Sequence, residues 1–124
     1  MSILKRSITA GINNMNRTSV ADAVHNLEEL SSALTTAYWE TSKIHRKDCI
    51  FDLITTIFGE LNELAKLSVS DHTMTYEPVT IAFQSSKLNL RHIQNNIEIW
   101  FPRTSTAKQL QQAIPPVANL FEVD

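Results

Sequence analysis

The sequence predicts a two-layer α+β fold, in which a helical hairpin packs on a three-stranded antiparallel meander with a short C-terminal helix. Two observations lead to this prediction. Over residues 19–68 the apolar residues recur every three to four positions, which is the period of one helical face. Over residues 79–101 they alternate with polar residues, which is the period of a strand with one buried face. The apolar face of such a sheet needs a layer of helices to cover it.

Size and composition exclude several classes of protein. The chain has 124 residues, of which 43% are hydrophobic, and this suits one globular domain. No apolar run approaches the ~20 residues that cross a bilayer, so we expect no membrane partner. The single cysteine, Cys49, cannot form an internal disulfide, and the chain has too few glycines for a phosphate-binding loop. Because no secretory signal pattern is present, we expect a cytoplasmic protein, and we expect no cofactor.

Residues 1–17 are expected to form a basic polar arm, and residues 18–124 a single globular domain. The arm contains Lys5, Arg6 and Arg17 and no acid, whereas the whole chain has a formal net charge of -2. Its apolar residues have partial helical spacing, so it either docks on the body or a partner, or remains a loose tail. Three charges attract an anionic surface only weakly, so we do not expect nucleic acid to be the main partner.

The first long helix is expected over about 19–43. Ser19 precedes Asp22 by three residues, a pairing that is typical of a helix N-terminus. The basic stretch 43–47 marks the break after this helix, because cations are favoured at a helix C-terminus.

The second helix is expected over about 47–68. It is apolar over more than half of its circumference, which predicts that it is buried on two sides or lies at a subunit interface. Gly59 in its middle predicts close packing of another backbone. Its acidic residues Glu60 and Glu63 are expected on the solvated face, like the other acids of the chain.

The meander is expected to consist of strands over 79–83, 88–91 and 97–101. Polar triplets at 84–86 and 94–96 separate these strands, and their composition is typical of turns. Such a sheet leaves edges that can pair with another chain.

A single helix over 79–101 is the alternative, and it would give an all-α four-helix bundle. A helical period also fits much of this segment. We favour strands because Ile81, Leu88 and Ile99 would lie on the wrong face of that helix. After the meander, Thr104 or Ser105 is expected to cap a short helix that ends at the two prolines after residue 114.

One group of side chains suggests metal or thiol chemistry. His45, Cys49 and Asp52 share a helical stripe if the second helix already includes His45, and His25 is a candidate for a further ligand. A small metal-binding or hydrolytic helical domain that uses these four residues is therefore an alternative function. We expect instead that Cys49 is a small buried hydrophobe, because no motif of a known catalytic type is present.

Aromatic and arginine side chains on polar faces suggest a binding surface for another protein. Tyr38 and Trp39 end the first helix, and Trp100 points away from the apolar strand face on the side of Arg91. Aromatic and arginine residues are typical anchors of protein interfaces. The competing interpretation is that the C-terminal helix or the arm covers Trp100.

The sequence therefore favours a small non-enzymatic interaction module of the adaptor, chaperone, inhibitor or immunity type. We expect its partner to be another protein chain, including a second copy bound through the second helix or a sheet edge. The metal-binding or hydrolytic domain is the first alternative. A nucleic-acid-binding regulator that acts through the basic arm is the second.

Overall fold

The structure is a computed structural model that describes residues 18–102 and 104–121, and every regular element in these ranges is a helix. The main helices are α1 (Val20–Glu40), α2 (Ile44–Leu64), α4 (Lys87–Asn95) and α6 (Thr104–Ala118). The short elements are η2 (Val69–Thr73), α3 (Ile81–Gln84), α5 (Ile97–Trp100) and η3 (Asn119–Phe121). The expected basic arm, residues 1–17, lies outside the described residues. Among the helices of the described ranges, none has both the length and the apolar character needed to span a bilayer.

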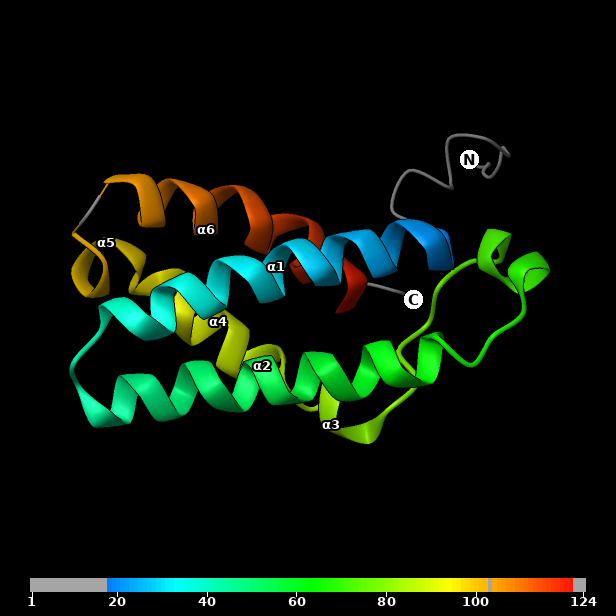
Figure 1. The fold of residues 1–124 in the computed structure, drawn as a ribbon, viewed down its shortest axis with the longest axis horizontal. Coiled ribbons are helices and arrows are strands. Elements are labelled where there is room, and N and C mark those ends of the chain that lie inside the picture. Colours follow the sequence, from blue (N-terminus) through cyan, green and yellow to red (C-terminus); the bar gives the residue numbers. More distant parts are fainter. Residues whose placement is uncertain (1–17, 103, 122–124) are drawn as a thin grey trace, which may run out of the picture.

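The helices pack side by side around one core. Figure 1 shows α1 and α2 as an antiparallel hairpin, with α6 along the other side of α1. Helix α4 contacts both α2 and α6, so that it closes the arrangement on the side away from α1. The buried side chains form a single hydrophobic cluster to which all six α-helices and η3 contribute. The all-α alternative therefore fits the structure, and the expected two-layer α+β fold is wrong.

The expected meander over 79–101 is replaced by three consecutive short helices, α3, α4 and α5. Within the described residues the only strand-like pairing is an isolated bridge between Ser19 and Thr75. The buried positions of the segment are spaced three and four residues apart, as on one helical face: Phe83, Ser86, Leu90, Ile93, Ile97 and Trp100. Helical packing thus overrides the weak helix propensity of this polar segment.

Three residues that favoured strands in the sequence turn out to lie on the solvent side of these helices. Ile81 is 79% exposed, Leu88 is 77% exposed and Ile99 is 69% exposed. Their aliphatic character favours burial, but single exposed aliphatic residues are common on protein surfaces.

The polar triplets do separate the elements, although the elements are of another type. Helix α3 ends at Gln84 and α4 begins at Lys87, so residues 85–86 form the first break. Asn96 alone separates α4 from α5. Because of these breaks, the alternative of one continuous helix over 79–101 is also inaccurate.

The ends of the hairpin helices differ from the expected ones by a few residues. The Ser19 hydroxyl accepts a hydrogen bond from the Asp22 N–H at 3.1 Å, which confirms the predicted start of α1. Helix α1 ends at Glu40, and Thr41 is extended, so the break lies at 41–43 instead of 43–47. Helix α2 begins at Ile44, and it therefore includes the basic residues that were expected to form the break.

Two further expectations about the helices are wrong. No described atom outside the local helix backbone comes within 4 Å of the position that a Cβ on Gly59 would take, so no neighbouring backbone packs there. Helix α6 continues through Pro115 and Pro116 to Ala118. Each proline removes one N–H donor and crowds a carbonyl of the preceding turn, but the burial of Val117 and Leu120 favours continuation of the helical path beyond both prolines.

Candidate interaction surface

The last turn of α1 presents two adjacent aromatic side chains, Tyr38 and Trp39, which the sequence singled out for partner binding. Trp39 is 75% exposed, and Tyr38 is half-buried against the core. Their rings meet edge to face, with centroids 5.1 Å apart. This geometry is a favourable arrangement for two aromatic quadrupoles.

Lys47 of α2 fixes the position of this aromatic pair. Its Nζ donates a hydrogen bond of 2.7 Å to the backbone carbonyl of Tyr38, one of the carbonyls left free at the end of α1. The same ammonium lies 3.9 Å from the centroid of the Tyr38 ring and 5.3 Å from that of Trp39. One cation therefore serves both the helix C-terminus and two aromatic faces. The pair is held in place before any partner arrives.

Helix α2 continues this surface with an exposed apolar stripe. Ile44 is 75% exposed, Phe51 54% and Phe58 53%, and the three residues are seven positions apart. Seven residues are almost two helical turns, so the three side chains lie on one line of the helix. The Phe51 ring is 6.1 Å from that of Tyr38, which joins the stripe to the end of α1.

We call the set Tyr38, Trp39, Ile44, Phe51 and Phe58 the α1–α2 apolar surface. Sequence reasoning identified Tyr38 and Trp39 but missed the three residues on α2. Their signal was present, because the seven-residue spacing is readable in the sequence. The apolar residues of α2 outnumber those that one core face can hold, and the sequence did not reveal which of them remain outside.

Trp100, a third predicted site residue, is buried at 8% exposure. Its ring is close to perpendicular to the rings of His45 and His92, whose centroids lie 6.5 Å and 5.2 Å from its own. The Arg46 guanidinium carbon lies 5.3 Å from the same centroid. It therefore fills the space between the start of α2 and α4. The expectation that Trp100 projects from the outer face of a sheet is wrong, because this segment forms helices.

Arg91, the fourth predicted site residue, is exposed on α4 and lines a small hollow beside Ala118 and Phe121. In the described part of the chain, the guanidinium over the Trp100 ring is that of Arg46, and not that of Arg91. The predicted pairing of Arg91 with Trp100 depended on cross-strand neighbours, and helical spacing separates the two side chains.

The alternative metal site is not assembled in the described residues. His25 lines a cavity between α1 and α6, together with Glu29 and Gln112. His45 lies in the first turn of α2 and faces Trp100, whereas His25 lies in the first half of α1. Asp52 is exposed on α2, and no group of three or more His, Cys, Asp or Glu side chains within residues 18–102 and 104–121 has the arrangement of a metal site.

Cys49 joins α2 to α4. Its thiol donates to the Asn89 side-chain oxygen at 2.6 Å, and the Asn89 amide donates to the Cys49 carbonyl at 3.3 Å. Burial raises the pKa of the Cys49 thiol, and the charge of Asp52 raises it further. A protonated, hydrogen-bonded thiol is a poor nucleophile, so the position of Cys49 suits packing between helices.

The most heavily hydrogen-bonded acid of the described chain is Glu60, which the sequence placed on a solvated face. That expectation is wrong, because Glu60 is fully buried. One carboxylate oxygen accepts from the Tyr76 hydroxyl at 2.6 Å and the Val79 N–H at 2.7 Å. The other accepts from the N–H and the hydroxyl of Thr80, both at 2.8 Å. These bonds replace water around the buried charge and anchor the chain before α3.

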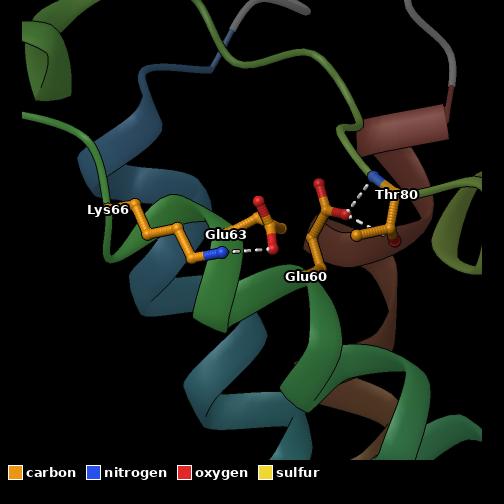
Figure 2. Close-up of polar contacts among 4 residues, drawn as sticks. All are labelled: Glu60, Glu63, Lys66 and Thr80. Atoms are coloured by element: carbon orange, nitrogen blue, oxygen red, sulfur yellow. Dashed lines mark hydrogen bonds and ion pairs between the residues drawn. The ribbon is translucent and has the colours of Figure 1, made fainter.

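Two acids one turn apart on α2 thus have opposite roles, as Figure 2 shows. Glu60 turns toward the segment that carries Thr80, whereas Glu63 turns toward Lys66, with which it forms a surface ion pair of 2.9 Å. The Glu63 side chain is 41% exposed, as expected for a solvated face. Burial, the hydrogen bond to Glu60 and the Glu60 charge raise the pKa of Tyr76 far above its usual range, so Tyr76 remains a hydrogen-bond donor.

Comparisons with known proteins give no family for this chain. No protein-family model matches it, and neither the curated proteins nor the solved structures include a significant match.

Proposed function

We propose that this protein is a small non-enzymatic interaction module that binds another protein chain through the α1–α2 apolar surface. The observation that carries the proposal is the exposed stripe of Ile44, Phe51 and Phe58 beside the exposed Trp39. Adaptors, chaperones, inhibitors and immunity proteins all act by such surface complementarity. The free thiol of Cys49 suits the reducing environment of the cytoplasm, where we propose that the protein acts.

The extent of the surface supports a binding role. A fully exposed large side chain presents ~200 Å², so the exposed fractions of these residues amount to about 500 Å² of apolar area. The largest apolar patch on a typical monomer covers about 300–600 Å² and is often functional. Because water contact with this area is unfavourable, its burial against a partner contributes to association.

The composition and rigidity of the surface also support a binding role. Tryptophan, tyrosine and phenylalanine are enriched in the cores of interfaces. Lys47 holds Tyr38 by a backbone hydrogen bond and a ring contact, so the aromatic pair loses little freedom when a partner binds.

Photo-crosslinking in the native cell tests this proposal. A benzoylphenylalanine residue is placed at position 58 in one variant and, as the matched control, at position 88 in another. Phe58 and Leu88 are both exposed apolar residues, but Leu88 lies on α4. We expect protein adducts at position 58, identified by mass spectrometry, and their loss when Phe51→Glu is added. Equal adducts at both positions, or none at position 58, contradict the proposal.

A further inference from the structure

We propose that the chain on the α1–α2 apolar surface is a second copy of this protein, bound across a two-fold axis with the two α2 helices antiparallel. In this arrangement Phe51 lies next to the axis, and Ile44 of each protomer packs against the partner's Phe58. The inference rests on the proposed function, because it names the partner of the same surface.

The spacing of the stripe is self-complementary. Ile44 and Phe58 are each seven residues from Phe51, so a two-fold axis through Phe51 exchanges the two ends of the stripe. An isologous interface requires such a patch, in which residue i contacts residue j and j contacts i. The stripe is ~21 Å long at 1.5 Å per residue, so three layers of side chains meet in one straight contact.

The helix dipoles favour the antiparallel orientation, and the charges beside the stripe do not oppose it. Asp48 is an exposed acid three residues from Phe51. In the antiparallel pair its two copies lie ~9 Å apart along the helices, a separation at which salt screens their repulsion. Lys47 remains engaged with Tyr38 and brings no unpaired cation to the centre of the contact. Antiparallel helices also place opposite ends of their macrodipoles together.

The area is sufficient for a weak but specific dimer. Two copies of the surface bury about 1,000 Å² of apolar area, and a polar rim adds to this. Stable interfaces bury about 1,200–2,000 Å² in total, so the pair lies at the lower end of that range. We therefore expect a dimer with a dissociation constant on the order of micromolar, because area at this end of the range gives modest affinity.

Sedimentation equilibrium of the full chain gives the first test. We expect the mass to rise from 14.0 kDa toward twice that value over the micromolar concentration range. The variant Phe51→Glu places two acids at the axis, and we expect it to weaken the dimer at least ~100-fold. The control Leu88→Glu adds the same charge at an exposed position on α4 and leaves the dimer unchanged. A wild-type monomer at all concentrations, or a dimer that survives Phe51→Glu, overturns the inference.

Cysteine crosslinking tests the register and does not depend on a charged variant folding normally. In a Cys49→Ser background, which retains a hydroxyl for the Asn89 contact, Phe51→Cys is expected to form a symmetric disulfide. Phe58→Cys alone is expected to form none, whereas Ile44→Cys combined with Phe58→Cys crosslinks. Equal crosslinking of Phe51→Cys and Phe58→Cys as single variants contradicts the antiparallel register.

The photo-crosslinking experiment separates failure of this inference from failure of the proposed function. Adducts between two copies at position 58 support both. Adducts to a different protein, or to residues 1–17 of the same chain, in a monomeric protein overturn the second-copy inference. Of these two outcomes, only the adduct to a different protein leaves the proposed function standing. The absence of adducts in a monomeric protein overturns both.

Discussion

Replacing Glu60 by glutamine gives the sharpest test of how the described chain is held together. The substitution keeps the size and shape of the side chain but removes its charge and exchanges one acceptor oxygen for an amide donor. Each Glu60 oxygen accepts two hydrogen bonds, from Tyr76 and Val79 on one side and from Thr80 on the other. A glutamine can satisfy one of these pairs of donors and must point its NH₂ group at the other pair.

The magnitude follows from the hydrogen bonds that are lost. Hydrogen bonds to a charged group contribute about 1.5–3 kcal/mol each. The amide leaves one backbone N–H without a partner and exchanges the bond with the hydroxyl, which turns to accept from the NH₂ group, for a neutral one; together these changes cost about 2.5–4 kcal/mol. The neutral amide is easier to bury than a carboxylate, which offsets part of this cost. We therefore expect Glu60→Gln to lower the free energy of unfolding by about 3 kcal/mol. For a chain of 124 residues this corresponds to a fall in Tm of about 10–15 °C.

Urea and thermal unfolding followed by circular dichroism measure this change, with the slope of the urea transition as a check on two-state behaviour. The matched control is Glu63→Gln, which lies one turn after Glu60 on α2 and removes the exposed ion pair with Lys66. We expect the control to change the free energy of unfolding by less than about 0.5 kcal/mol. A loss below about 1 kcal/mol in Glu60→Gln, or equal losses in both variants, would refute the anchoring role of Glu60.

Four further predictions concern single residues. Tyr76→Phe removes one donor to Glu60 and should cost about 1–2 kcal/mol in urea unfolding, where no measurable loss would contradict the hydrogen bond. Tyr76 keeps its proton in the folded chain, whereas the unfolded chain loses it near pH 10.0. The free energy of unfolding should therefore fall as the pH rises above about 10, and it should fall less steeply in Tyr76→Phe. Equal slopes in the two proteins would contradict the raised pKa of Tyr76. Gly59→Ala should raise the free energy of unfolding by about 0.5–1 kcal/mol, because the added methyl group meets no described atom, and a loss of stability would indicate a contact at that point. The Cys49 thiol should react with a disulfide reagent at least ~10-fold more slowly in the folded protein than in urea at pH 8, and fast labelling of the native state would exclude its protonated, hydrogen-bonded state.

For residues 79–101, the sequence predicts where the elements are interrupted better than it predicts whether they are strands or helices. The polar residues that interrupt the apolar pattern do lie between elements, at 85–86 and at Asn96. Both a strand and a helix leave the same residues at such breaks, so the breaks do not distinguish the two. A strand would bury Ile81 together with Phe83, whereas the helix buries Phe83 and exposes Ile81. Which of these occurs is set by packing against the neighbouring helices and not by the local sequence.

The candidate surface was predictable in part for a similar reason. Tyr38 and Trp39 follow from their position at the end of a periodic helix, and both help to form the surface. Phe51 and Phe58 resemble core residues in sequence, because only the placement of α1 and α4 shows which side of α2 is covered. Glu60 was unpredictable, since its donors Tyr76 and Thr80 are distant in sequence and reach it only in the folded chain.

The link between α2 and α3 has a practical consequence for engineering. Its tip, η2, has no buried residue. Beyond the tip, the chain is fastened by hydrogen bonds of 2.8 Å from the Val20 N–H to the Met74 carbonyl and 2.7 Å from the Tyr76 N–H to the Thr18 carbonyl. A peptide tag or a reporter inserted at η2 would therefore leave these two hydrogen bonds in place. Doubling the length of such a loop raises the entropic cost of closing it by only about 0.6 kcal/mol. The chain thus offers a graft point for labels at the end of α1 that lies opposite Tyr38 and Trp39.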